Sequence, residues 1–532
     1  MKSESSQLYS NILFCSTMNA SDEKYVNAEA DKFPIEESSS KGSTSVEEYT
    51  DMEADDGLLK KMNLVNNAVE EIGLTWYHLK LFFLAGFGYS ADSQVMIVQS
   101  SVATQVSYQF GVDYPYTTEC LYIGLFLGAL IIGFGADIMG RKRIFNLTLL
   151  LTCIFGFFIG GMSSLATYNI FLVLAGITCG GNLALDVTVF LEVLPFKWKW
   201  VTTTFASWWG VGQTIATLFA WAFIANYSCE SKDFCPSSIN RGWRYCWYAN
   251  SALLLVCALA RLFVFKMEES PKFLVSVGRD EEAVAALQNI AHKYNRKCSL
   301  TLDQLAEYNA DVPAYFNEKE VTVMDILKIS LLHLKKLFAT RKAIRSTITL
   351  FVSWLCMGVC YAVYSNFVSE FLKTRMGSNQ STFLQYRDST LTYFVSIFGP
   401  TIAAILTLIP RVGYRGALAI GGVVAMALLF GYTSADNENA SVGFSTTSYL
   451  GMNIYYGCLF AYTPEVFPAG ARTTGAGIGL LLNRIGGIIA PIVVYYGDTT
   501  SSIPLWVCGA IIGFIGLCAL TLPFEPTKHK SL

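Results

Sequence analysis

The sequence predicts an all-α membrane protein in which twelve transmembrane helices form two six-helix pseudo-repeats. Three observations predict this fold. Of the 532 residues, 53% are hydrophobic and only 15% are charged, apolar runs recur along the chain, and the two halves share motifs at a nearly constant offset. Soluble domains carry about 25% charged residues, and a helix needs roughly 20 apolar residues to cross a bilayer. A lipid bilayer is therefore the expected solvent of most of the chain.

The first 75 residues have a different composition, because they are rich in Ser, Asp and Glu and poor in aliphatic residues. Such a segment buries too little apolar surface to offset its ordering entropy, so we expect a disordered acidic tail. The tail lacks the basic start, apolar centre and cleavage site of a secretory signal peptide. The first spanning helix is therefore expected to direct the chain to the membrane.

The twelve expected spans divide the chain into two bundles. They lie at about 79–101, 117–136, 144–164, 168–193, 203–226, 247–267, 346–372, 386–409, 416–433, 444–463, 474–496 and 504–523. The expected domains are the tail (1–75), an N-terminal six-helix bundle (76–267), a linker with amphipathic helices (268–343), a C-terminal six-helix bundle (344–524) and a short tail (525–532).

Basic residues predict the orientation of these spans. Most loop Lys and Arg residues lie on one side, together with the basic residues of the linker. The positive-inside rule then places both termini and the linker in the cytoplasm, in the plasma membrane or an internal membrane. Glycosylation triplets at Asn226, Asn379 and Asn439 all fall in the opposite loops, which predicts a glycoprotein. In one of these loops, Cys229 and Cys235 are expected either to form a disulfide or to stay unpaired.

The two halves repeat one plan. Glu192 of "LEVLP" corresponds to Glu465 of "PEVFP" at an offset of 273 positions, and Gly140 corresponds to Gly413 at the same offset. Parallel repeats of six helices imply a substrate path between the halves, near the middle of the bilayer.

The stretch "GFGADIMGRKR" at 133–143 resembles the loop between helices 2 and 3 of major facilitator superfamily transporters. "ESPKFLVSVGRDEEA" and "PEVFPAGAR" resemble segments of the sugar-porter branch. "GFGYSADSQ" and "GITCGGNLALDVTVFLEVLP" are similar to the branch of synaptic-vesicle-glycoprotein-like proteins, niacin transporters and fungal orphan metabolite transporters. The resemblance covers about residues 70–525. The sugar porters' Gln-Gln-x-Ser-Gly-x-Asn motif is absent from the seventh span, which weakens a sugar assignment.

The resemblance implies that loops such as 133–143, at the cytoplasmic ends of the helices, lock an inner gate. Glu192 is followed after seven positions by Lys199, and Glu465 at the same interval by Arg472, which suggests two ion pairs. The alternative is that these residues only fix the topology or are solvated at the interface. The expected gating residues are Gly133, Asp137, Gly140, Arg141, Lys142, Glu192, Lys199, Arg415, Glu465 and Arg472.

Acidic residues deep in the spans are the strongest candidates for the transport site, because a charge at the centre of a bilayer costs about 2.5–3.5 kcal/mol. Asp92 lies in the middle of the first span and is expected to carry a coupled proton, or else to bond to Ser90 or Ser93. Asp186 lies in the fourth span, one turn after Asn182, and is expected to bind substrate. Weaker candidates for substrate or proton coupling are Gln213, Tyr361, Asn366, Asn483 and Arg484. Arg484 is expected to neutralise a cavity carboxylate or to bind an anionic substrate.

No Ser/His/Asp set, metal-ligand spacing or phosphate-binding loop occurs in the spans, so the sequence predicts neither an enzyme nor a cofactor. A net charge of −3 argues against a nucleic-acid partner. The predicted function is secondary active transport of a small polar metabolite (an organic ion, carboxylate or sugar-like solute) by alternating access, with protons as the coupling ion. The alternative is a transporter-like sensor or scaffold that does not transport. The sequence leaves the oligomeric state open.

Overall fold

The computed structural model describes residues 46–112, 115–139, 141–229, 235–264, 267–308, 334–335, 337–376, 381–435, 437–467, 472–496 and 501–525. Within these ranges, side chains are described outside 46–56, 133–139, 184, 264, 366–376 and 472–473.

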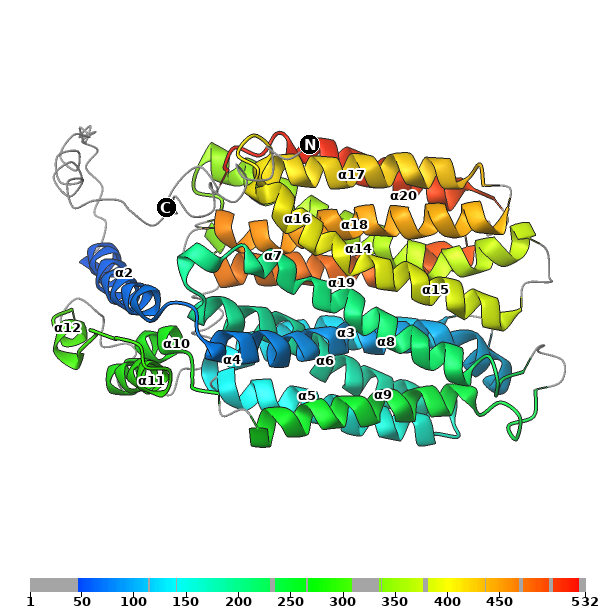
Figure 1. Cartoon of the computed structure of the whole chain (residues 1–532), viewed down its shortest axis with the longest axis horizontal. Coiled ribbons are helices and arrows are strands. Elements are labelled where there is room, and N and C mark those ends of the chain that lie inside the picture. Colours follow the sequence, from blue (N-terminus) through cyan, green and yellow to red (C-terminus); the bar gives the residue numbers. More distant parts are fainter. Residues whose placement is uncertain are drawn as a thin grey trace, which may run out of the picture. The chain divides into compact units, whose positions relative to one another are not determined.

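The N-terminal bundle follows the predicted order of helices. It consists of α3 (Trp76–Phe110), α4 (Tyr116–Met139), α5 (Arg141–Gly161), α6 (Leu165–Val193), α7 (Val201–Phe205), α8 (Ser207–Phe223) and α9 (Gly242–Leu259). A short 3-10 turn, η2 (Phe196–Trp198), follows α6, and a π-helical turn, η3 (Ala260–Val264), extends α9. Figure 1 shows these helices running nearly parallel in the lower part of the view.

The C-terminal bundle forms the upper part of Figure 1. It consists of α14 (Arg341–Met376), α15 (Thr382–Ser396), α16 (Phe398–Leu408), α17 (Gly413–Tyr432), α18 (Glu438–Val466), α19 (Arg472–Tyr496) and α20 (Ile503–Ala519). The eighth predicted span is divided between α15 and α16. Pro400 explains the break, because it has no N–H to donate to the carbonyl of Ser396.

The helices have the length and hydropathy that the sequence predicts for membrane spans. In the part of the chain that the structure describes, eight helices are long and apolar enough to cross a membrane, and two shorter apolar helices lie at Tyr116–Ile132 and Ile503–Ala519. Every one of the twelve predicted runs coincides with a helix or a pair of consecutive helices. The predicted fold class is therefore confirmed.

Glycines let neighbouring helices of a bundle approach closely. A Cβ atom on Gly128 of α4 would lie 2.0 Å from the carbonyl oxygen of Ile177 in α6, and Gly422 of α17 meets Gly516 of α20. Lipid tails provide no hydrophobic force between helices, so such backbone contact stabilises the packing by van der Waals attraction and excludes larger residues.

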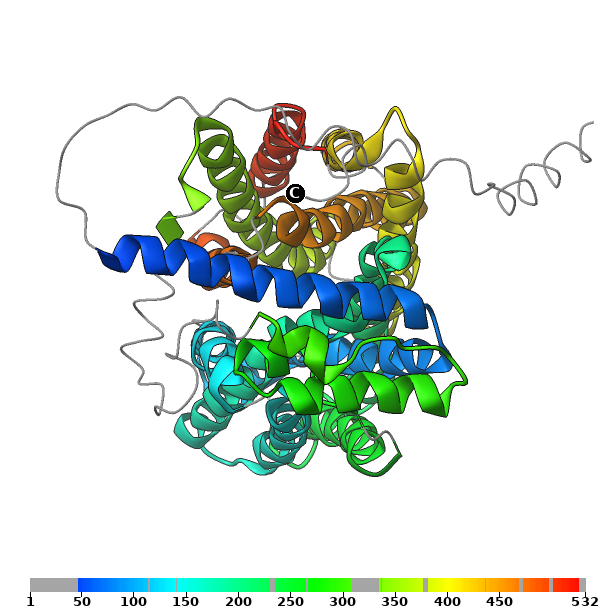
Figure 2. The same cartoon turned by 90° about the vertical axis from the view of Figure 1, so that its left-hand side faces the viewer.

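The described residues of the linker form three short helices, α10 (Pro271–Ser276), α11 (Asp280–Lys293) and α12 (Leu302–Ala306). They lie beyond one end of the spanning helices, which we call the linker end. Figure 2 views the protein from this end, with the N-terminal bundle below and the C-terminal bundle above. The linker sequence 309–333 lies outside the described residues.

The predicted tail is helical in its last part, which corrects the expectation of disorder up to residue 75. Helix α2 (Val46–Ile72) buries Val65, Ala68, Val69 and Ile72, which fall on one helical face. Composition concealed this short apolar stripe because acidic residues surround it. Residues 1–45 lie outside the described part.

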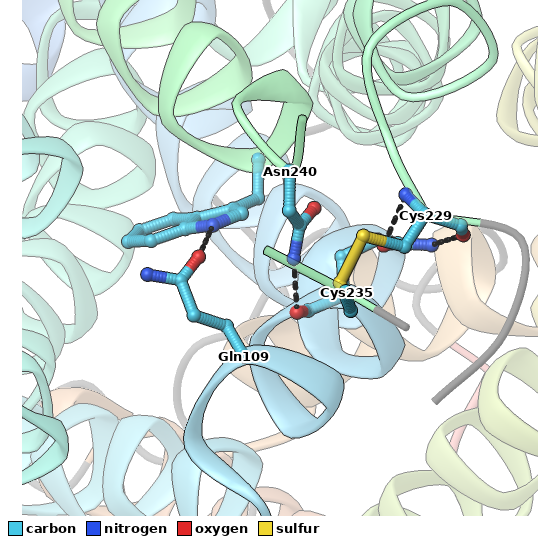
Figure 3. The surroundings of a disulfide bond; sticks show 6 residues. Gln109, Cys229, Cys235 and Asn240 are labelled. Atoms are coloured by element: carbon cyan, nitrogen blue, oxygen red, sulfur yellow. Dashed lines mark hydrogen bonds between the residues drawn. A yellow bond between two sulfur atoms is a disulfide. The ribbon is translucent and has the colours of Figure 1, made fainter. Parts of the chain in front are cut away.

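At the opposite end of the N-terminal bundle, Cys229 and Cys235 form a disulfide with a Cα–Cα distance of 5.4 Å (Figure 3). The Gln105 side chain of α3 binds the backbone of Cys229 in both directions, at 3.1 and 3.2 Å. Asn240 donates to the carbonyl of Gln105 at 2.8 Å. The loop is therefore fastened to the end of α3, and of the two sequence alternatives the structure has the bridge.

Candidate functional site

A buried ion pair joins the two bundles near their centre. Nη2 of Arg484 in α19 donates to Oδ2 of Asp92 in α3 at 2.6 Å, and the two side chains are 2% and 0% exposed. The residues are 392 positions apart in the sequence. Such charge-assisted bonds are short and strong, and a buried charge without its partner is costly. The pair thus links α3 to α19 only while both groups are charged and in place.

The guanidinium of Arg484 is incompletely satisfied. Its Nη1 has the Met96 thioether sulfur as a partner at 3.5 Å, which is a weak acceptor. Its Nε is buried without a hydrogen-bond partner among the described residues. The second carboxylate oxygen of Asp92, Oδ1, is likewise buried without a hydrogen-bond partner among the described residues.

A narrow cavity lies beside this ion pair, between the two bundles. It is lined by Ser93, Met96, Ile97, Ser100, Thr118, Leu121, Tyr122, Trp209, Gln213, Tyr361 and Ser365. Met96 forms both part of the cavity wall and the contact with Arg484. Residues from both halves thus surround the space, as expected for a path between the repeats.

A chain of hydrogen bonds crosses from one half to the other along the cavity wall. The Trp209 indole N–H donates to the Tyr361 hydroxyl at 2.8 Å, and that hydroxyl donates to Gln213 Oε1 at 3.1 Å. Gln213 Nε2 in turn donates to the Tyr449 hydroxyl at 2.8 Å. Gln213 and Tyr361, two predicted substrate residues, are therefore brought together.

Aromatic rings form much of the surrounding wall. Tyr361 stacks on Tyr456 with ring centroids 5.5 Å apart and an interplanar angle of 24°, and the Tyr449 ring lies 5.1 Å from that of Tyr361 at an interplanar angle of 39°. Trp209 lies 6.0 Å from Tyr456. Flat aromatic surfaces of this kind suit a solute that has a flat or apolar body.

A second buried ion pair lies inside the N-terminal bundle. Arg261, in the π-helical turn η3, binds both oxygens of Asp186 at 2.9 and 3.0 Å. Its other donors reach the carbonyls of Leu84 and Phe145 and the Asn182 side chain. Asn182 also donates to Asp186 at 2.8 Å, as their spacing on one helix face predicts. Asp186 and Asn182 do not line the cavity. The ion pair of Asp186 with Arg261 instead connects α3, α5, α6 and η3 within the N-terminal half.

At the linker end, the predicted gating residues Arg141 and Glu192 form an ion pair. The Glu269 carboxylate accepts hydrogen bonds from the backbone N–H groups of Arg141 and Lys142, at 3.0 and 3.1 Å. These N–H groups begin α5, and a carboxylate there satisfies free donors and the positive helix end. The predicted partner of Glu192 was Lys199, whose ammonium instead lies 4.5 Å from the ring centroid of Phe196.

The C-terminal half repeats this carboxylate arrangement. Glu525 accepts from the backbone N–H groups of Tyr414 and Arg415, at 2.9 and 3.2 Å. Tyr414 is 273 positions after Arg141 (414 − 141), so the predicted sequence offset is also a structural one. Arg415 donates its side chain to the carbonyl of Leu520 as well.

Several predicted residues lie elsewhere or are outside the described part. Asn483 binds the carbonyl of Trp354 at 3.3 Å and accepts from the Tyr456 hydroxyl at 3.3 Å, behind the aromatic wall. Glu465 lies at the end of α18. The side chains of Gly133, Asp137, Asn366 and Arg472, and all of Gly140, are outside the described residues.

Sequence reasoning missed Arg261, Glu269, Glu525 and the aromatic residues Trp209, Tyr449 and Tyr456. Arg261 had a usable signal, because it is a basic residue inside an apolar run, like Arg484. The aromatic residues had none, since aromatic residues are common in spanning helices.

Cross-half hydrogen bonds lie on both sides of the cavity along the bundle axis. Towards the linker end, the hydroxyls of Ser207 and Thr401 are 3.3 Å apart. Towards the opposite end, the Tyr386 hydroxyl donates to the carbonyl of Ser101 at 2.9 Å. The cavity thus has contacts between the halves above and below it.

Comparison with known proteins gives consistent results. A family model described as "Sugar (and other) transporter" matches residues 67–525. The chain is 36% identical over 478 residues to "MFS siderochrome iron transporter 1" of Ceriporiopsis subvermispora, covering 89% of this chain and 92% of the relative. It is 31% identical to "Major facilitator-type transporter hxnZ" of Emericella nidulans, covering 92% and 91%. Among solved structures, the proton:xylose symporter XylE matches with a TM-score of 0.62 at 16% identity, covering 85% of this chain and 96% of that one.

Proposed function

Because this chain belongs to the sugar (and other) transporter family of the major facilitator superfamily, we propose that it moves a small polar solute across a membrane by alternating access, coupled to protons. The observation that carries the proposal is the buried ion pair between Asp92 and Arg484 beside the central cavity. It is the point where a proton, a solute and the contact between the two halves meet.

The ion pair links protonation to movement. When Asp92 is ionised, separating it from Arg484 leaves two buried charges unpaired, and breaking such a pair costs about 3–5 kcal/mol. A proton on Asp92 removes one of these charges and lowers that cost. The transporter with bound solute and protonated Asp92 therefore converts between its outward-open and inward-open states more readily than the empty transporter with ionised Asp92.

The carboxylate contacts at the linker end supply the gate in this proposal. Glu269 and Glu525 each hold the beginning of a helix, and Arg141 with Glu192 adds an ion pair in the N-terminal half. These contacts lie within each half and keep its helix ends together. The two halves meet at this end between Ser207 and Thr401, and separating that contact lets the two bundles rock apart.

We propose that the linker end is cytoplasmic, with both termini on that side. The excess of basic loop residues supports this orientation. The disulfide between Cys229 and Cys235 at the opposite end supports it as well, because such bonds persist in oxidising compartments.

The test is uptake by purified protein in proteoliposomes, over a panel of labelled sugars, organic cations, organic anions and, given the name of one relative, an iron chelate. We expect one solute class to accumulate only with an inward proton gradient. Asp92→Asn mimics the protonated acid, and it should preserve solute exchange while abolishing accumulation. Accumulation by Asp92→Asn at the wild-type level would contradict the role of Asp92. A folded protein that transports no panel member with or without a gradient would instead support a sensor or scaffold.

A further inference from the structure

Among the described residues, Arg261 and Arg484 are buried in the membrane region, and their hydrogen-bonding groups are satisfied to very different degrees. All three nitrogens of Arg261 have oxygen partners, and Nη2 binds both oxygens of Asp186. Arg484 holds one oxygen of Asp92 and a thioether, and its Nε has no hydrogen-bond partner in the described part. A buried guanidinium normally uses most of its five N–H donors. Arg484 is therefore the arginine that has donors to spare for a ligand.

Arg484 does not itself line the cavity but lies directly behind one of its lining residues. Met96, the partner of Nη1, is one of the lining residues. Tyr122, another lining residue, packs against Gly487, less than one turn after Arg484 in α19. A solute in the cavity thus needs to displace only a thioether, a weak acceptor, to reach the guanidinium.

Charge balance then specifies the sign of the solute. None of the eleven residues that line the cavity carries a formal charge, so Asp92 and Arg484 set the charge of the site, and they sum to zero. When a proton neutralises Asp92, the positive charge of Arg484 is left without compensation in a region of low dielectric constant. A buried cation of this kind needs an anion close to it.

We propose that the transported solute is a small organic monoanion whose carboxylate replaces Asp92 as the partner of Arg484. The proposal rests on the proton-coupled transport described above and adds its substrate class. The Asp92 carboxylate takes up one proton and becomes a neutral acid, while the carboxylate of the solute keeps its charge and binds Arg484. One proton and one monoanion then cross together, so each cycle moves no net charge.

The cavity wall favours a particular kind of monoanion. Trp209, Tyr361 and Tyr122 contribute aromatic side chains to the lining, and Gln213 and Ser93 contribute polar ones. An aromatic or unsaturated ring with one carboxylate matches both features, since the ring packs among the aromatic side chains and the carboxylate reaches Arg484.

The test uses ligand series of matched shape that differ only in charge. One series is benzoate, benzamide and benzylammonium, and a second is glucuronate, glucose and glucosamine. Binding to the full-length protein in detergent is measured by titration calorimetry near pH 7. Repeating each titration in buffers of different ionisation enthalpy gives the number of protons taken up. We expect the benzoate series to prefer its anion, with uptake of about one proton per anion.

Variants of the ion pair separate this proposal from a merely structural role. Arg484→Gln should weaken anion binding by roughly 30-fold or more, because the loss of one member of a buried charge pair has effects of that order. Arg484→Lys keeps the charge, so it should retain part of the affinity and controls for misfolding. Asp92→Asn should bind the anion without proton uptake. Arg279→Gln removes an exposed arginine of the linker end and should change neither quantity.

The outcomes distinguish the two proposals. Preference for a neutral or cationic member in every series, no binding of any anion, or anion binding without proton uptake in the unmodified protein overturns the assignment of the substrate class. Proton-driven accumulation of a neutral sugar in proteoliposomes would overturn it too, yet leave the proposed function standing. Anion binding without transport of any solute would contradict the proposed function instead.

Discussion

The ion pair between Asp186 and Arg261 should act as a clamp that stabilises the N-terminal bundle, and removing its cation tests this directly. In Arg261→Met, Asp186 remains buried at 0% exposure without its cation, and the carbonyls of Leu84 and Phe145 lose their donors. Removing one member of a buried pair costs about 3–5 kcal/mol. We therefore expect the free energy of unfolding to fall by about 4 kcal/mol, a large part of the stability of one bundle.

A double-mutant cycle measures how much of this cost comes from the pair itself. Asp186→Leu combined with Arg261→Met leaves no buried charge, and such replacements are often close to neutral. The backbone carbonyls still lack donors, so we expect the double variant to be less stable than the unmodified protein. Its loss should nevertheless be smaller than the sum of the two single losses by at least about 2 kcal/mol.

Titration with a denaturing detergent in mixed micelles, followed by tryptophan fluorescence, gives the free energy of unfolding for each variant. Solute uptake per folded molecule is measured in parallel with Asp186→Asn, and Asp303→Asn on the exposed face of α12 serves as the control. Reduced stability with an unchanged KM in Asp186→Asn supports the clamp. A raised KM with unchanged stability would refute it and would restore Asp186 as the substrate ligand that its sequence position suggests.

Three further predictions concern the linker end and the disulfide. Glu192→Gln should break the ion pair with Arg141 and increase the labelling, from the linker side, of a cysteine introduced in place of Ser365 in the cavity wall, with the total amount of folded protein unchanged. The hydrogen bonds from Ser299 lower the pKa of Glu71. This contact therefore stabilises the fold fully above the ordinary carboxyl pKa, and the stabilisation is lost as the pH falls through the lower pKa of the folded state. Hydrogen exchange of α2 should quicken below about pH 4 in the unmodified protein, but not in Glu71→Gln. Cys229→Ser should leave Cys235 reactive towards a thiol reagent applied to the side opposite the linker, whereas the unmodified protein shows no reaction at either position.

The fold was predictable from the sequence because each spanning helix must be apolar along its own length. A run of 20 apolar residues carries that information locally, and all twelve runs became helices. Helix α2 was not predicted because its own composition does not indicate a buried helix. Its stability depends on partners far along the chain, such as the contact of Lys61 with Asp280 at 2.6 Å, and no local composition reports such a contact.

The sequence allowed the charged residues of the candidate site to be identified, but not which of them form ion pairs with each other. Asp92 and Arg484 were recognisable because charges in apolar helices are costly, yet their pairing joins residues that are 392 positions apart. Their joint position depends on how the two bundles face each other. Asn182 and Asp186 were predicted as neighbours because both lie on one helix, where spacing alone determines proximity.

Comparing the two pseudo-repeats shows which features occur in both halves and which occur in only one half. The carboxylates of Glu269 and Glu525 hold helix ends that are 273 positions apart, so the linker-end contacts follow the repeat. The central charges do not, since the position equivalent to Asp186 is Leu459 (186 + 273). In the first and seventh spans, Gly86 and Tyr89 match Gly358 and Tyr361 at an offset of 272. At this offset Asp92 corresponds to Tyr364 (92 + 272). In the proposed mechanism, two bundles that rock against each other need similar contacts at their ends, because both take part in closing the same gate. The proposed single coupled proton needs only one carboxylate, and a second buried acid at the equivalent position would add a desolvation cost without a cation to balance it.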